Sequence, residues 1–494
     1  MLHRRTLVLL TALLVTLTAC STLAERAERG ADRVSDLVSG DEDDVDASAE
    51  QSERDETSSE DDPDPELESD VDPLTDSEGT ENADLDELIE DAEEEVEAPA
   101  GTELVAPEVT RRDLPDATDA TIEHIAFVEA FWADVDDELD FTYEPLDDAR
   151  LLPRSTIIGE DTPCSFRRIE EPLDADIAAF NAYVTFCEEG ITVVWDDLGL
   201  EPDLEARFPG AGMAMLISHE WGHVVQLQRE QFGQSSIIAE QQADCYSGAY
   251  AAWAEDRNIE PFTNDQALDF AIISTLETRD TVGSRPDDFG AHGNGFDRVR
   301  ATQEGYDRGV SFCATYDVTP PPITQTGFLS AQDRDNEGNL PYDAAFELLV
   351  PAVEDFYESL SDESLAAIVD EPDERILRDL HAAIGDVAIG TEYSLRYGAA
   401  LQEANGDAVG GVGPALQRAC LAGAFLNDAL ENGIGDDGTG TGTPAGSLSP
   451  GDLDEAIITL STSDELLSNP GVVFEMVAAL RVGTIEGLDA CALA

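Results

Sequence analysis

The pattern of hydrophobic and polar positions divides the chain into three parts. Residues 1–20 contain one short apolar run, and residues 21–105 consist largely of Asp, Glu, Ser and Thr. A segment with so few large apolar side chains cannot offset the entropy of ordering it, so we expect 21–105 to form a disordered stalk. From residue 106 onward, apolar residues return at helical spacing. One predicted helix spans residues 213–228, with apolar positions Met215, Leu216, Val224, Val225 and Leu227.

One later run has the composition of a β-strand. Residues 191–197, ITVVWDD, are rich in β-branched and aromatic side chains. We therefore expect an α+β fold with two mainly helical halves and a small sheet in the first. Three prolines at 320–322 break helix and sheet alike, so the predicted domains are a first half at 106–318 and a second half at 319–494.

The first 20 residues have the features of an export signal. Arg4 and Arg5 precede an apolar run that is too short for a comfortable membrane span. Residues 17–20, LTAC, match a bacterial lipobox. The match implies cleavage before Cys20 and lipid modification of its thiol, which would anchor the protein to the extracytoplasmic face of the cell membrane. The alternative is an ordinary secretory signal peptide that is cut nearby.

The net charge of the chain limits the kinds of molecule that it can bind. The formal net charge is -83 at pH 7, and every basic residue apart from histidine is arginine. An acidic surface of this size argues against nucleic acid as a partner. It suggests a halophilic protein that works in high salt, where repulsion between its own charges is screened.

The strongest chemical signal is His219-Glu220-Trp221-Gly222-His223 in the predicted helix 213–228. Residues four apart lie on one face of a helix, so the imidazoles of His219 and His223 can bind one ion beside Glu220. This is the H-E-x-x-H pattern of a zinc site. Two core histidines that happen to be four residues apart are the alternative.

A catalytic zinc ion takes three protein ligands, so a third is needed. Glu240 and Asp244 are again four apart, on the next predicted helix. We expect Glu240 to be the third ligand and Asp244 to accept a ring N–H from a ligand histidine. Spacing alone does not separate these two roles, and the reverse assignment stays open.

Together, HEWGHVVQ (219–226) and EQQADCYSG (240–248) resemble the predicted neutral zinc metallopeptidase family of bacteria. The resemblance covers residues 106–318 and implies Zn²⁺, a zincin-like fold and hydrolysis of peptide or protein substrates. Glu220 would act as general base for a zinc-activated water. In such enzymes an edge strand beside the zinc helix aligns the substrate, and residues 192–195 are candidates for this role. A strand that merely completes the sheet fits them equally well.

The second half repeats the order of motifs in the first. Residues 295–313 match 473–491 at one offset, and Gly222 and Gln226 recur as Gly398 and Gln402. The proposed metal and acid–base residues do not recur. By alignment, His219, Glu220, His223, Glu240 and Asp244 become Leu395, Arg396, Ala399, Ala415 and Ala419. We therefore predict a degenerate second copy without the metal site.

The six cysteines beyond Cys20 fit the same duplication. Cys245 with Cys313 and Cys420 with Cys491 are equivalent pairs, one in each copy, which leaves Cys164 with Cys187. A rival interpretation makes Cys245 a metal ligand because it adjoins Asp244. Its twin Cys420 persists where the other ligands are gone, which favours the disulfide.

Two functions remain open from the sequence. The first is a membrane-tethered zinc endopeptidase, and the second is a non-catalytic cell-envelope binding protein with a structural zinc ion. Peptide hydrolysis also needs a donor to the oxyanion, for which His292 and Tyr246 are candidates. A histidine in a solvent-exposed glycine-rich loop is the simpler interpretation of His292, so neither residue is assigned.

Overall fold

The structure is a computed structural model that describes residues 105–491, apart from 115, 159–178, 188–189, 232–233, 265, 289, 329, 436–443 and 463–471. The predicted signal peptide, its lipidation site Cys20, almost all of the predicted stalk and Cys164 lie outside the described residues. The described chain is mainly helical with one small sheet, as expected of an α+β fold. None of the described helices is both long enough and apolar enough to cross a membrane.

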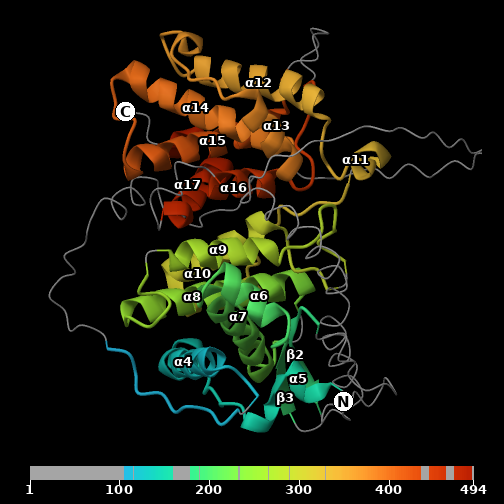
Figure 1. Cartoon of the computed structure of the whole chain (residues 1–494), viewed down its shortest axis with the longest axis vertical. Coiled ribbons are helices and arrows are strands. Elements are labelled where there is room, and N and C mark those ends of the chain that lie inside the picture. Colours follow the sequence, from blue (N-terminus) through green and yellow to red (C-terminus); the bar gives the residue numbers. More distant parts are fainter. Residues whose placement is uncertain are drawn as a thin grey trace, which may run out of the picture.

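The first half contains the three-stranded sheet and several helices (Figure 1). Its strands are β1 (Leu151–Pro153), β2 (Ala182–Cys187) and β3 (Gly190–Trp195). Its helices are α4 (Asp119–Val135), α5 (Arg154–Ile157), α6 (Leu200–Arg207), α7 (Ala211–Gln228), α8 (Ser236–Asp256), α9 (Ala267–Glu277) and α10 (Gly295–Cys313).

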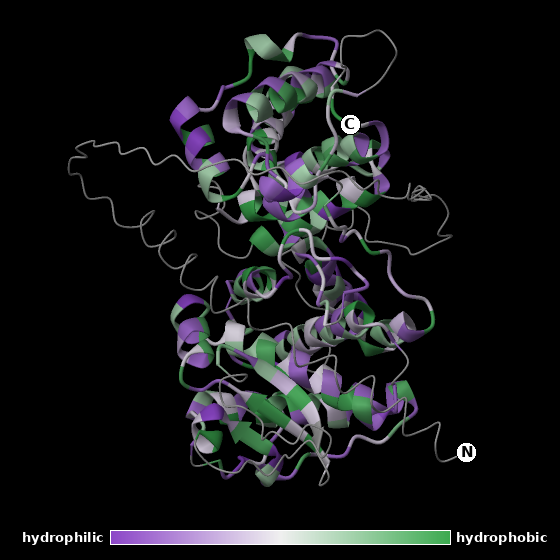
Figure 2. Cartoon of the chain, turned by 90° about the vertical axis from the view of Figure 1, so that its right-hand side faces the viewer, coloured by the Kyte–Doolittle hydropathy of each residue, from purple (hydrophilic) through white to green (hydrophobic). Residues whose placement is uncertain are grey.

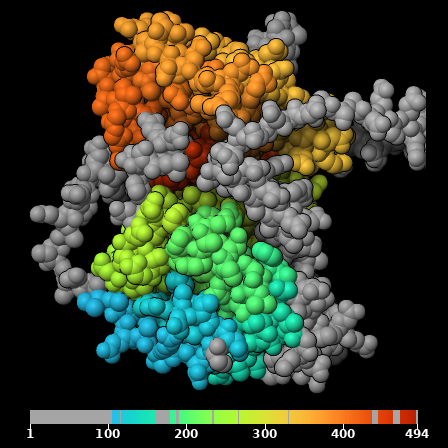
Figure 3. Space-filling model, in the orientation of Figure 1, coloured from blue at the N-terminus to red at the C-terminus, as the bar shows by residue number. Residues whose placement is uncertain are grey.

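The regular structure in the described part of the second half is helical, apart from one isolated bridge. Its helices are α11 (Ala331–Asp335), α12 (Tyr342–Glu358), α13 (Glu374–Ala383), α14 (Val387–Asn405), α15 (Val412–Asn432), α16 (Asp452–Thr462) and α17 (Val472–Glu486). Figures 1 and 3 show this half as an upper lobe, in orange, above the blue-to-green first half. The red helices α16 and α17 belong to this half and lie on the side of it that faces the first half.

The sheet has the order β1-β3-β2, with β3 parallel to β1 and antiparallel to β2. Its strands consist mostly of hydrophobic residues (Figure 2). Residues 192–195 therefore lie in a central strand whose two edges are both paired. The expectation that they form a substrate-binding edge is wrong, because a paired strand has no free backbone groups to offer. The strand that contacts the histidine helix α7 at the edge of the sheet is β2.

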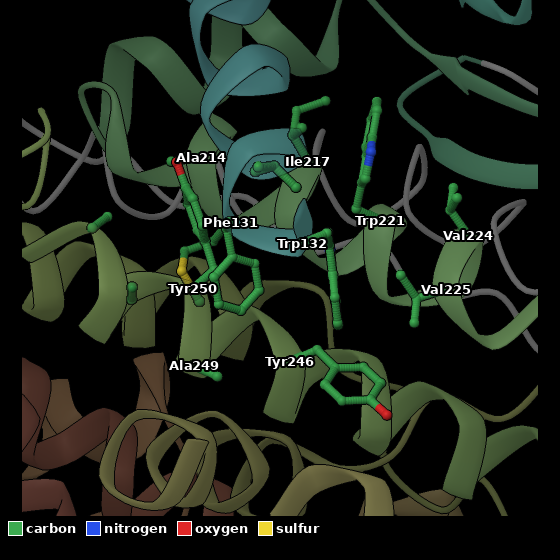
Figure 4. Packing of buried hydrophobic residues seen from close by; sticks show 14 of the residues in the cluster. Phe131, Trp132, Ala214, Ile217, Trp221, Val224, Val225, Tyr246, Ala249 and Tyr250 are labelled. Carbon is green, nitrogen blue, oxygen red and sulfur yellow. The ribbon is translucent and has the colours of Figure 1, made fainter. Parts of the chain in front are cut away.

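Aromatic side chains pack α4, α7 and α8 into one core (Figure 4). The rings of Trp132 on α4 and Tyr246 on α8 meet edge to face, with centroids 5.0 Å apart. Trp221, next to the metal-site motif on α7, is fully buried, and its indole N–H donates to the Tyr143 hydroxyl at 2.9 Å. Burial of large aromatic side chains stabilises this helix, so the histidines are mounted on a rigid element.

Glycines bring α8 and α10 into very close contact. A Cβ atom on Gly248 would lie 1.8 Å from the Thr302 carbonyl oxygen, and one on Gly305 would lie 1.7 Å from the Cys245 carbonyl oxygen. In the second half, α15 and α17 cross in the same way. There, Cβ atoms on Gly423 and Gly483 would lie 2.0 and 1.9 Å from carbonyl oxygens. Only glycine permits such an approach of two backbones.

Each of these helix pairs is joined by a disulfide, as predicted. Cys245 bonds Cys313 and Cys420 bonds Cys491, with a Cα–Cα distance of 5.5 Å in both. The disulfide explains the position of Cys245 beside Asp244, so this cysteine is not a metal ligand. The predicted pair of Cys164 with Cys187 lies outside what the structure describes.

The two halves contact each other through α9 and α10 on one side and α16 and α17 on the other. The Phe296 N–H donates to Asp454 Oδ1 at 2.8 Å, and the Phe474 N–H donates to Asp269 Oδ1 at 3.0 Å. The alignment of the halves equates Phe296 with Phe474, and the match of ALDFAII (267–273) with DLDEAII (452–458) equates Asp269 with Asp454. The two bonds are therefore reciprocal, as in an interface with twofold symmetry.

Candidate metal centre

Two histidine nitrogens and one carboxylate oxygen meet where α7 crosses α8. The rings of His219 and His223 are almost perpendicular, with centroids 4.9 Å apart. The Nε2 atoms of His219 and His223 lie 3.2 and 3.4 Å from the same Glu240 oxygen, Oε2. The three ligand atoms all lie within 4.8 Å of one another. The structure thus brings together the three residues that the sequence singled out as ligands.

Asp244 approaches the opposite side of the His219 ring. Its Oδ1 atom lies 2.7 Å from His219 Nδ1, and Arg298 donates one hydrogen bond of 2.8 Å to each carboxylate oxygen. A carboxylate can only accept hydrogen bonds, so Nδ1 of His219 bears the proton and Nε2 is free to coordinate. Since both oxygens of Asp244 are engaged in this way, the geometry favours Glu240 over Asp244 as the ligand.

Gln226 orients the second histidine. Its Oε1 atom lies 2.9 Å from His223 Nδ1, while its amide N–H groups donate to the Ala239 carbonyl and to Gln242 Oε1. These last two bonds determine which way the amide faces. Nδ1 of His223 is therefore the protonated nitrogen, and its Nε2 is also free to coordinate. The sequence comparison assigned Gln226 a structural role because it recurs as Gln402, and it missed this contact with His223.

Gly222 allows α7 to approach α8 closely enough for these contacts. A Cβ atom at this position would lie 2.9 Å from the Cα atom of Ala243. Ala243 adjoins Asp244 and lies about one helical turn from Glu240. Any larger residue at 222 would push α8 and its two acidic side chains away from the histidines.

Burial and charge set the proton affinities in the site. Burial lowers the pKa of His219, but the negative charges of Asp244 and Glu240 outweigh it and raise the pKa to about 10. Burial raises the pKa of Glu240, but His223 and His292 reverse the effect and hold it well below its usual value. Burial also raises the pKa of Asp244, and Arg298 more than offsets this rise. The ligand carboxylate is thus kept ionised.

Glu220 differs from the two other acids. Burial raises its pKa, and the nearby charges of His219 and His223 only partly offset the rise. Its Oε2 atom is buried and has no hydrogen-bond partner among the described residues. A buried carboxyl group with a raised pKa and one unused oxygen is suited to accept and return a proton near neutral pH.

The site opens into a cavity of about 320 Å³. One wall is the edge strand β2, through Ala182, Tyr183 and Val184, and the floor is formed by α7. The segment between α9 and α10 closes the other side, where Asp280 and His292 line the cavity. A peptide could therefore lie between an unpaired strand edge and the metal centre.

His292 lies in this cavity wall and not in a free surface loop. Its Nδ1 atom is 3.3 Å from Asp280 Oδ1, and the backbone N–H groups of His292 and Gly293 both donate to Asp280 Oδ2. Its charge acts on both Glu220 and Glu240. By contrast, Tyr246 is fully buried against α4, and its hydroxyl accepts from Arg229. Of the two candidate donors to an oxyanion, only His292 borders the cavity.

The donor set fits zinc. Two imidazole Nε2 atoms and one carboxylate oxygen form a three-ligand site, and each ligand histidine is oriented by a hydrogen bond at its other nitrogen. The cavity leaves room for a fourth, exchangeable ligand. Comparison of the chain with protein-family models, curated proteins and solved structures finds no match.

Proposed function

We propose that the chain is a zinc endopeptidase, with His219, His223 and Glu240 as ligands and Glu220 as general base. One observation supports this most strongly: both Nε2 atoms converge on one Glu240 oxygen at the side of a cavity, with Glu220 adjacent. An ordinary pair of core histidines would have no reason to share a buried carboxylate and to be oriented from behind by Asp244 and Gln226.

Each residue of the site has a distinct task in this reaction. His219, His223 and Glu240 would hold the zinc ion, which would supply Lewis-acid chemistry for a bound water and for the scissile carbonyl. Glu220 accepts the proton that the attacking water loses and passes it to the departing amine. In its imidazolium form, His292 donates Nδ1–H to Asp280 and can donate Nε2–H to the oxyanion.

The edge of β2 provides a place for the substrate backbone. Among the described residues β2 pairs with β3 alone, and its residues 182–184 line the cavity. An extended peptide can add to such an edge as a further strand, with main-chain hydrogen bonds that do not depend on side-chain identity. We assign this role to β2, in place of the central strand β3.

The second half acts as a scaffold derived by duplication and has no metal site of this kind. A conserved contact supports the duplication. Gln226 donates to the Ala239 carbonyl and to Gln242, and Gln402 donates to the Pro414 carbonyl and to Gln417 at the aligned positions. The matching disulfides, glycine crossings and reciprocal bonds between Phe296, Phe474 and the two aspartates point the same way.

We further propose that Cys20 anchors the mature protein to the extracytoplasmic face of the membrane. The LTAC sequence supports this, and the acidic segment 21–105 would give the enzyme reach from the surface. The two disulfides fit an oxidising location outside the cytoplasm.

The deciding experiment compares the wild-type chain with Glu220→Gln in high salt. Bound zinc is measured by elemental analysis, and hydrolysis is measured on an unstructured protein substrate. We expect one tightly bound zinc ion in both proteins and hydrolysis by the wild type only, because glutamine keeps the shape of Glu220 but cannot accept a proton. Arg308→Gln, an exposed substitution outside the cavity, is the control and retains full activity.

Each other outcome has a defined meaning. Zinc retained by both proteins with no cleavage by either, over a range of salt, would favour a binding protein with a structural zinc ion. No zinc in the wild type would overturn the metal centre itself. Equal hydrolysis by wild type and Glu220→Gln would remove the general base.

A further inference from the structure

Three carboxylates meet in the interior of the second half, far along the chain from the histidine motif. Asp386, Asp452 and Glu455 are only 5, 4 and 6 % exposed. One oxygen atom from each lies within 4.8 Å of the others. Asp386 immediately precedes α14, while Asp452 and Glu455 lie on the first turn of α16. Buried carboxylates this close together repel one another and require a compensating positive charge.

The backbone holds one oxygen of each carboxylate. Asp386 Oδ2, Asp452 Oδ2 and Glu455 Oε2 each accept a hydrogen bond from a backbone N–H group. The donors are Leu340 at 2.9 Å, Ser449 at 2.7 Å and Val387 at 3.0 Å, respectively. Donation by a backbone N–H group stabilises the ionised form of a carboxyl group. Burial and repulsion between the acids outweigh these bonds and raise the pKa of all three carboxyl groups.

The second oxygens of the two aspartates are unused. Asp386 Oδ1 and Asp452 Oδ1 are buried, and neither has a hydrogen-bond partner in the described chain. Protonation would relieve the repulsion but would leave these buried oxygens without a hydrogen-bond donor from the described chain. A bound cation satisfies both requirements, because it neutralises the charge and coordinates the free oxygens.

The neighbouring charged groups do not supply this compensation. Asp333 adds to the negative potential at Asp452, and Asp454 adds to it at Glu455. The His381 ring acts electrostatically on Asp386, but its Nε2 atom bonds the Leu340 carbonyl at 2.8 Å and forms no ion pair with the three carboxylates in the described chain. No arginine in the described part of the chain forms an ion pair with the three carboxylates.

The surrounding loops pack closely against these carboxylates. A Cβ atom on Gly385, which has a φ of +152°, would lie 1.9 Å from Glu455 Oε1. Asn339 accepts the Asp386 N–H at 2.7 Å and so ties a second loop to the site. Gly338 in that loop approaches the Pro450 carbonyl, where a Cβ atom would lie at 2.6 Å. Three chain segments, 333–340, 385–387 and 449–455, therefore converge on the carboxylates.

We propose that Asp386, Asp452 and Glu455 bind a calcium ion that clips these three segments together. The donors are all oxygen atoms, which hard divalent cations prefer to the nitrogen and sulfur ligands of zinc. Ca²⁺ accepts irregular sets of carboxylate ligands and gives up its waters readily. Mg²⁺ requires a nearly octahedral site and retains several waters, which suits a buried carboxylate cluster less well.

The site is specific to the second half. The alignment of the two halves places Gly210, Ala267 and Phe270 at the positions of Asp386, Asp452 and Glu455. The same helices therefore form in the first half without any of these acids. The three carboxylates are not needed to build the fold, so a separate function must account for them.

The test is calcium-dependent stability of the full mature chain in about 1 M NaCl, where the Debye length of about 3 Å suppresses loose binding to the acidic surface. The protein is stripped with chelator, reloaded with zinc, and titrated with CaCl₂ by calorimetry and by thermal unfolding. We expect one calcium ion per chain and a rise of several degrees in Tm. The Asp386→Asn/Asp452→Asn variant should lose both effects. Its calcium-free Tm should equal or exceed that of the wild type, because the repulsion is gone.

A matched control removes the same charge from the surface of the same half. Asp362→Asn/Glu363→Gln changes two exposed acids and should keep the full calcium response. If the double aspartate variant does not fold, Asp452→Asn alone is used, with a weakened response expected. The proposal is overturned if wild type shows no calcium response, if the aspartate variant responds like wild type, or if only MgCl₂ stabilises the chain. Peptide hydrolysis is measured separately, so failure of one proposal does not affect the other.

Discussion

At the scale of single residues, each histidine of the candidate metal centre has one ring nitrogen bound to a neighbouring side chain and the other available to a metal ion. Nδ1 of His219 is bound by Asp244 and Nδ1 of His223 by Gln226, which leaves both Nε2 atoms directed at Glu240. Arg298 in turn fixes Asp244. Contacts of this kind typically change metal affinity by 10- to 100-fold. The ligands are therefore preorganised by a polar network that reaches from α7 through α8 to α10.

His292→Ala is expected to lower the turnover number by about 10²-fold, because one donor to the oxyanion is removed. Zinc content and KM should change little, since His292 is not a ligand. Steady-state hydrolysis of a peptide, with zinc measured on the same samples, checks this. His292→Gln, which keeps a side-chain N–H donor, should recover part of the loss. Ser284→Ala changes another cavity residue and should have no effect. Full activity of His292→Ala would rule out the role.

The sequence singled out the candidate ligand residues because their chemistry follows helical spacing. His219 and His223 are four apart on α7, and Glu240 and Asp244 are four apart on α8, so each pair was visible as one face of a helix. The pairing of His292 with Asp280 was not visible. Eleven residues of mostly irregular chain separate the two, and no periodic pattern marks such a contact.

At the scale of elements, glycines where helices cross determine how closely the residues of the site approach one another. Gly222 lets α7 lie against α8, and Gly248 and Gly305 let α8 lie against α10. The disulfide from Cys245 to Cys313 then joins α8 to the end of α10. Because α8 carries Glu240 and Asp244, the geometry of the metal centre depends on how closely these three helices approach.

Gly222→Ala is expected to destabilise the chain by about 1–3 kcal/mol, since the new methyl group meets the backbone of α8 at 2.9 Å. It should also weaken zinc binding, because Glu240 moves away from the histidines. Gly398→Ala is the matched control at the aligned position in α14. Its nearest contact is a flexible one, Arg418 Cγ at 3.1 Å, so the effect should be close to zero. Thermal unfolding and competition with a zinc chelator measure both. Equal effects of the two substitutions would contradict this explanation.

The helices and the strand composition were predictable, but the order of the strands was not. The run at 191–197 was correctly assigned to a strand, since β-branched and aromatic residues favour one. Its central position follows from pairing with both β1 and β2. Hydrophobic composition on both faces is typical of a covered strand, and that signal argued against an edge. Residues 154–181 separate β1 from β2 in sequence, and local sequence carries no information on the order in which these strands join the sheet.

At the scale of the whole molecule, each half contains, among its described residues, one cluster of side chains that could hold a metal ion. The first cluster has nitrogen and oxygen atoms on α7 and α8, and the second has only oxygen atoms before α14 and on α16. The sequence comparison predicted that the second half lacks the residues of the first cluster. It missed the three carboxylates there, because Asp386 is far from Asp452 and Glu455 in sequence and all three are inconspicuous among 109 acidic residues. Only the fold brings Asp386 next to Asp452 and Glu455.

Because the net charge is -83, the stability of the chain depends on the salt concentration as well as on the fold. Like charges repel in the compact state, and added salt screens this repulsion, with a Debye length of about 10 Å at 0.1 M and about 3 Å at 1 M. We therefore expect Tm to rise steeply between these concentrations of NaCl and more slowly above them. Choline chloride should act like NaCl at equal ionic strength, because screening does not depend on the identity of the cation. A Tm that stays constant from 0.1 M to several molar NaCl would show that the acidic surface is not an adaptation to salt.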